Sequence, residues 1–134
     1  MYKIERIKKY TVQLALNDEV LNIRLDGLKQ FKKYLEAQER LLDIQHKMEI
    51  MSKNATEDKN LDEMITLLGD TIIYMFTVLF GEENTQKIVD FFEGNYDEMM
   101  TAIMPFITKE VIPTLKAIAK EQSKAVVERI KNVP

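Results

Sequence analysis

The first part of the chain alternates apolar and polar residues with the period of a β-strand. Apolar side chains stand at Tyr10, Val12, Leu14 and Leu16, and again at Leu21, Ile23 and Leu25. Side chains of a strand point alternately to its two faces, so this pattern predicts a β-hairpin over residues 10–25 that turns at Asn17-Asp18-Glu19. An isolated two-stranded hairpin is marginal in water. We therefore expect it to pack on helices or to join strands of another subunit in a homo-oligomer.

A long helix is predicted over residues 28–51, where neither proline nor glycine occurs. Its apolar residues fall at alternating spacings of three and four: Tyr34, Ala37, Leu41, Ile44, Met48 and Met51. Such spacing is typical of a coiled-coil seam and also of a helix that covers its own core. Leu28, Phe31 and Leu35 lie one residue out of this phase, which favours packing against the chain's own helices.

Residues 52–60 are polar and predict an exposed linker. Residues 61–119 then predict a helical core, because the stretch 72–80 is apolar at every position except Thr77. Gly81 follows directly and is expected to end this helix in a left-handed conformation.

The helices after this point have their own start and stop signals. Asn84 and Asn95 are each expected to cap a following helix. Pro105 and Pro113 interrupt the last apolar segment, since proline removes a helical hydrogen bond and displaces the preceding turn. We therefore expect a proline-kinked C-terminal helix, followed by a more polar helical tail over residues 120–134.

The chain has 134 residues, which fits a single, mainly α domain with a short N-terminal β-hairpin. It contains no cysteine, so disulfides, thiolate nucleophiles and cysteine-ligated zinc are excluded. The amino terminus mixes charges and lacks the apolar core of a signal peptide. The longest apolar stretch, Met64–Phe80, contains Asp70 and is shorter than the roughly 20 residues that span a bilayer. We expect a cytoplasmic protein without a membrane partner.

Charge is distributed unevenly along the chain, although the net charge is only -3. Residues 57–100 carry 2 Lys or Arg against 11 Asp or Glu, whereas residues 1–56 carry 11 against 8 and residues 101–134 carry 6 against 3. An acidic middle repels phosphate backbones, so nucleic acid is not an expected ligand. This asymmetry indicates either protein partners or a solvated helix face.

Catalytic and metal-binding motifs do not stand out in the sequence. His46 is the only histidine, with Asp43 three residues before it, whereas a di-iron site needs a repeated Glu-x-x-His and further carboxylates. Adjacent carboxylates such as Glu82 and Glu83 point in different directions on a helix and are explained by helix starts. Because phosphate loops, nucleophile elbows and zinc spacings are also missing, we expect a protein without catalytic activity, cofactor or metal.

The order of elements resembles the tail assembly chaperones of long-tailed bacteriophages and prophages of low-GC Gram-positive bacteria. The resemblance covers roughly residues 10–108: a strand pair, a long charged helix, a polar linker, an apolar helix that runs into Leu79-Phe80-Gly81-Glu82, and a short helix ending near Gly94. Glu83 stands where a glycine is expected after Phe-Gly-Glu, and the C-terminal extension is longer than expected.

This resemblance implies a non-catalytic protein that binds the phage tape measure protein and helps to recruit tail tube subunits. It would act in the host cytoplasm and be absent from the mature virion. Methionine is unbranched and polarizable, so Met99, Met100 and Met104 predict either an adaptable groove or the filling of irregular core space. The partner-binding residues that we expect are Phe80, Gly81, Met99, Met100, Ile103 and Met104.

Two other functions fit the same sequence. A structural subunit of a phage tail or connector would use the strand pair to join a sheet across subunits. A bacterial helical regulator would bind one partner through its long helix.

Overall fold

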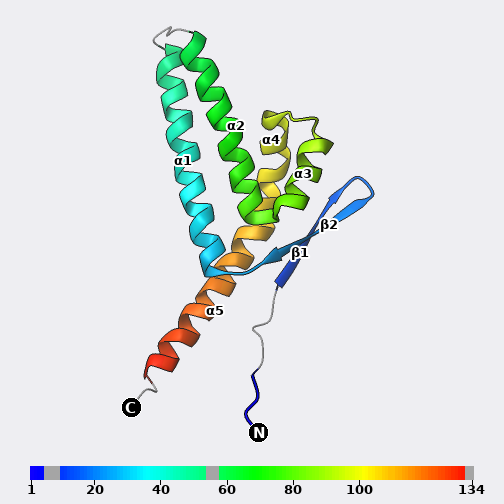
Figure 1. Ribbon diagram of the computed structural model, residues 1–134, viewed down its shortest axis with the longest axis vertical. Coiled ribbons are helices and arrows are strands. Elements are labelled where there is room, and N and C mark those ends of the chain that lie inside the picture. Colours follow the sequence, from blue (N-terminus) through cyan, green and yellow to red (C-terminus); the bar gives the residue numbers. More distant parts are fainter. Residues whose placement is uncertain (5–9, 54–57, 132–134) are drawn as a thin grey trace.

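The chain is mainly helical with an N-terminal antiparallel hairpin, which confirms the predicted fold class (Figure 1). The computed structural model describes residues 1–4, 10–53 and 58–131. Its elements are β1 (Tyr10–Leu16), β2 (Glu19–Leu25), α1 (Leu28–Lys53), α2 (Asp58–Phe80), α3 (Glu82–Phe91), α4 (Tyr96–Phe106), the π-helical turn η1 (Ile107–Val111) and α5 (Ile112–Lys131). The hairpin and the start of the long helix lie at the predicted positions.

Helices α1 and α2 lie side by side and run roughly along the upper part of the molecule's long axis (Figure 1). The predicted inner stripe of α1 is buried at Tyr34, Ala37, Leu41 and Ile44. The expectation that α1 packs against the chain's own helices is therefore confirmed.

The predicted linker over residues 52–60 is wrong at both ends, because α1 continues to Lys53 and α2 begins at Asp58. Residues 54–57 lie outside the described residues. Polar residues suit an exposed helix end as well as a loop, so composition alone did not locate the ends of these helices.

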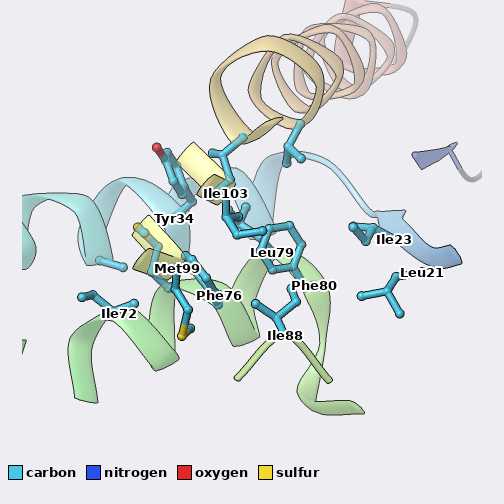
Figure 2. Packing of buried hydrophobic residues seen from close by; sticks show 14 of the residues in the cluster. Leu21, Ile23, Tyr34, Ile72, Phe76, Leu79, Phe80, Ile88, Met99 and Ile103 are labelled. Atoms are coloured by element: carbon cyan, nitrogen blue, oxygen red, sulfur yellow. The ribbon is translucent and has the colours of Figure 1, made fainter. Parts of the chain in front are cut away.

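The core surrounds the second half of α2, where Met75, Phe76 and Leu79 are almost completely buried. Figure 2 shows Phe76 and Leu79 within this cluster. The rings of Phe76 and Phe80 meet edge to face, with centroids 5.4 Å apart. Strand β2 supplies Leu21, Ile23 and Leu25 to the same cluster, so the hairpin is stabilised by packing on the helices. This confirms one of the two arrangements expected for it.

The C-terminal segment faces the core with one residue in every four: Met99, Ile103, Ile107, Val111 and Leu115. Four residues of a regular α-helix advance about 40° beyond a full turn, so such a row would drift away from the core. The π-helical turn contains one residue more than an α-helical turn, which brings the residues that follow it back to the side facing the core. Within this turn, the Ile112 N–H donates to the carbonyl of Ile107. Pro105 and Pro113 lie on either side of this turn.

Helix α5 extends beyond the body of the molecule (Figure 1), and residues 123–131 are exposed. The predicted helical tail is confirmed as far as Lys131, and residues 132–134 lie outside the described residues. Among the described residues, one stretch, Leu61–Phe80, is long and apolar enough to span a membrane, and 39% of an 18-residue window within it is buried inside the protein. Core helices of soluble proteins also meet this criterion.

The predicted helix caps are confirmed in part. The Asn95 side chain accepts a hydrogen bond from the Glu98 N–H at 3.1 Å, as a cap does. Asn84 was wrongly expected to be a cap: Gly81 occupies that position, and the Asn84 amide instead donates to the carbonyls of Phe80 and Asn22. Gly81 has φ 84° and ψ 163°, a region that only glycine readily adopts and that differs from the expected left-handed helical conformation.

Candidate functional site

The six predicted partner-binding residues do not line one groove. Met99 and Ile103 are only 0% and 2% exposed and pack in the core between α2 and α1 (Figure 2). Phe80 is also buried, Met100 and Met104 are half-buried, and Gly81 is exposed. The expectation of a groove along α4 is therefore wrong for Met99 and Ile103, which lie on the inward row of this helix, whereas Met100 and Met104 are only partly accessible.

Phe80 and Gly81 border a separate surface hollow of about 410 Å³. Its remaining lining comes from Val20–Asn22, Glu82–Asn84 and Lys87. The Lys87 ammonium lies 3.1 Å from the carboxylate of Glu19 and 3.9 Å from that of Glu83. Charged side chains thus surround this hollow, and it is a poor receptor for an apolar helix.

A more apolar groove lies between α1 and the C-terminal segment. It has a volume of about 480 Å³ and is lined by Phe31, Tyr34, Leu35 and Gln38 of α1 and by Thr108, Ile112, Pro113 and Lys116. We call it the α1–α5 groove. Its aliphatic and aromatic side chains suit contact with another apolar surface.

The α1 side of this groove continues as a stripe of exposed leucines. Leu28, Leu35 and Leu42 recur every seven residues and are 51%, 45% and 59% exposed. Phe31 and Gln38 stand between them, so the spacing alternates between three and four. We call these five residues the outer stripe; it extends over about 21 Å at 1.5 Å per residue. Leu28, Phe31 and Leu35 were visible in the sequence as residues out of phase with the inner stripe.

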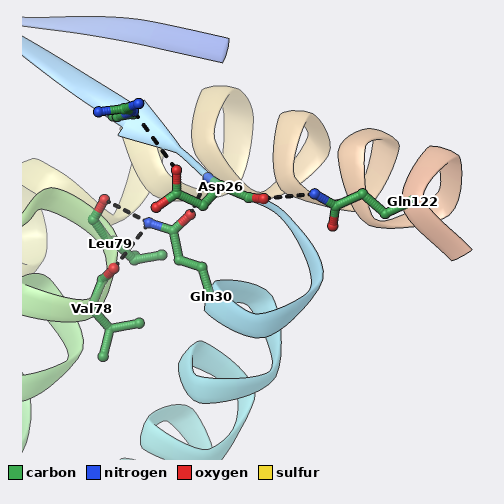
Figure 3. Close-up of polar contacts among 6 residues, drawn as sticks. Asp26, Gln30, Val78, Leu79 and Gln122 are labelled. Carbon is green, nitrogen blue, oxygen red and sulfur yellow. Dashed lines mark hydrogen bonds and ion pairs between the residues drawn. The ribbon is translucent and has the colours of Figure 1, made fainter. Parts of the chain in front are cut away.

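Two glutamine side chains fix the N-terminal end of α1 in place (Figure 3). The Gln122 amide donates to the carbonyl of Asp26 at 2.8 Å and accepts from the Leu28 N–H at 2.9 Å. The Gln30 amide donates to the carbonyl of Val78 at 2.9 Å and accepts from the Asp26 N–H at 2.9 Å. These bonds connect α5 and α2 to the start of α1, so both walls of the groove have fixed positions.

Tyr34 reports on this groove through its titration, because burial raises the pKa of its phenol. Because the Tyr34 phenol holds its proton to a higher pH in the folded state than in the unfolded state, the folded state loses stability as the pH rises above the ordinary tyrosine pKa of about 10. We expect wild-type protein to lose more stability between pH 9 and 11 than Tyr34→Phe, measured by urea denaturation at each pH. Both proteins keep Tyr10, whose pKa the neighbouring Glu121 carboxylate raises. Equal losses would contradict the burial of the phenol.

Metal-ligating side chains do not converge in the part of the chain that the structure describes, where no group of three or more His, Cys, Asp or Glu could hold an ion. His46 is exposed, and the Asp43 carboxylate pairs with the Lys47 ammonium at 3.0 Å. The surface with the clearest capacity for binding is thus the α1–α5 groove with its outer stripe.

Comparisons of the chain with protein-family models, with curated proteins and with solved structures found no match. The resemblance to phage tail assembly chaperones therefore stays a prediction drawn from the order of the elements and from the Phe-Gly-Glu junction.

Proposed function

We propose that this protein is a non-catalytic assembly chaperone that binds an amphipathic helix of the phage tape measure protein in the α1–α5 groove. The observation that supports it is the outer stripe, whose leucines are about half exposed although they repeat at helical spacing. In this proposal the bound tape measure helix stays soluble, and the complex recruits tail tube subunits in the host cytoplasm.

The groove suits a helix for a geometric reason. Apolar residues at spacings of three and four present knobs and holes to a helix that lies nearly parallel to them. A visiting helix would contact the outer stripe on one side and Ile112 and Pro113 on the other. Binding would cover apolar surface on both proteins, which removes the exposed patches through which long amphipathic helices aggregate.

The first test is co-expression with the tape measure protein of the same phage. We expect wild-type protein to raise the soluble fraction of the tape measure protein and to co-purify with it. Leu35→Glu should lower the affinity at least about tenfold, or about 1.4 kcal/mol, because binding would bury a carboxylate without a partner among apolar side chains. Leu35 is exposed, so the circular dichroism spectrum should stay unchanged.

Lys33→Glu is the matched control, because Lys33 is an exposed residue of α1 outside the outer stripe. It introduces the same carboxylate two positions away and should leave binding intact. An unchanged soluble fraction with wild-type protein, or equal binding by Leu35→Glu, would contradict the proposal.

A structural subunit of the tail or connector is the second candidate, and the outer position of β1 favours it. Strand β2 lies against α2 and α3, whereas β1 pairs only with β2 among the described strands. Mass spectrometry of purified phage particles separates the two functions, since a structural subunit stays in the virion and a chaperone does not.

A further inference from the structure

Strand β1 leaves one edge open for another strand. The sheet contains only β1 and β2 within the residues described, and β2 makes the more extensive contacts with the helices, although the Tyr10 hydroxyl of β1 also donates to Glu121 of α5. The apolar face shows a similar asymmetry along most of its length: Leu21, Ile23 and Leu25 of β2 are fully buried, whereas on β1 Leu16 is buried but Val12 and Leu14 are half-buried. Apolar surface therefore remains for a neighbour beside β1.

This edge lacks the devices that usually protect an edge strand. Proteins place lysine, proline, inward charges or bulges on such edges to prevent pairing with other chains. Residues 10–16 contain neither a charged residue nor a proline, and all seven pair with β2 in one unbroken register from Tyr10↔Leu25 to Leu16↔Glu19. The strand is thus regular, uncharged and open, which is the condition for strand addition.

We propose that β1 pairs with β1 of a second copy of this chain, in antiparallel orientation about a two-fold axis at Gln13. The two hairpins then form one four-stranded sheet with both β1 strands at its centre. In this register Gln13 faces its own copy, and Val12 faces Leu14 of the partner subunit. Because strand faces alternate with period two, Val12 and Leu14 of both subunits stay on the apolar face.

The absence of charge on β1 supports a second copy as the occupant. An isologous interface brings each side chain near the two-fold axis against its identical counterpart. A charged residue there would meet the same charge, which destabilises directly opposed strand positions. Uncharged β1 avoids this repulsion, whereas β2 carries Glu19 and Arg24.

A charge at the axis tests the pairing. Gln13 is exposed, and its amide donates to the Asn22 side chain at 2.9 Å on the solvent face of the hairpin. Gln13→Lys and Gln13→Glu should each raise the dimer dissociation constant at least about tenfold in sedimentation equilibrium, because like charges meet across the axis. An equimolar mixture of the two variants should restore the dimer, since Lys then faces Glu.

Asn22→Lys is the control, because it removes the same hydrogen bond and adds the same charge directly opposite Gln13 on β2. Its two copies would lie three strand spacings apart, about 14 Å, which exceeds the Debye length at physiological salt. It should dimerise like wild type. A wild-type protein that stays monomeric at all concentrations, a Gln13→Lys dimer as tight as wild type, or equal dissociation of Asn22→Lys would overturn the proposal.

Discussion

Aspartate in place of Met99 or Ile103 is expected to destabilise the folded protein strongly. Both side chains are essentially inaccessible to water and contact the apolar cluster around Phe76. An unpaired carboxylate there loses its hydration and gains no partner, so we expect a loss of at least about 3 kcal/mol of the free energy of unfolding. Small domains have only about 5–15 kcal/mol in total. Far-UV circular dichroism and urea denaturation measure the loss.

Ala102→Asp is the control for this substitution, because Ala102 is exposed on the same helix. It should leave the unfolding midpoint nearly unchanged. A Met99→Asp variant with the wild-type spectrum and midpoint would contradict the core position of this residue and would restore the groove that the sequence predicted along α4.

Gly27→Ala is the second substitution with a large expected effect. Gly27 has φ +110°, which L-residues with a side chain rarely adopt, and a Cβ atom there would overlap the carboxamide of Gln122. Backbone strain costs about 1–3 kcal/mol. Displacing Gln122 loses two hydrogen bonds of about 1 kcal/mol each. The free energy of unfolding should fall by about 2–4 kcal/mol, measured by urea denaturation.

A double-mutant cycle separates the two causes. Gln122→Ala removes the overlapping side chain, so Gly27→Ala should cost less in that background than in the wild type. Gly94→Ala isolates backbone strain alone, because Gly94 has φ +74° and a Cβ atom added to it would meet no other atom within 4 Å. Strictly additive losses for Gly27→Ala and Gln122→Ala would contradict the overlap.

Local patterns predicted the elements of this fold well. Period-two alternation identified the hairpin, and the spacing of three and four identified the inner stripe of α1, because both patterns record which side chains face a core. They were less informative about helix ends. The polar residues near Lys53 and Asp58 fit a linker as well as they fit exposed helix, so only the folded structure distinguishes the two.

The candidate site was harder to predict, since it depends on contacts distant in sequence. Phe31 and Ile112 line one groove although about eighty residues separate them in the chain, and no local sequence pattern indicates that the two lie close together. The methionines of α4 were visible in the sequence, but their pattern did not show whether they are buried or bind a partner. Apolar spacing on a helix is the same for a core face and a binding face, so the sequence left Met99 open to both interpretations.

The π-helical turn decides which side chains of α5 face α1. If Ile107–Val111 formed regular α-helix at the same chain length, all that follows would rotate by roughly a quarter turn, because the π-turn holds one extra residue and each α-helical residue adds about 100°. Ile112, Pro113 and Lys116 would then face elsewhere while α1 remained as it is. Substitutions that replace the π-turn by α-helix without changing the chain length thus offer a route by which diverging relatives could change the width and chemistry of their receptor without altering its longer wall.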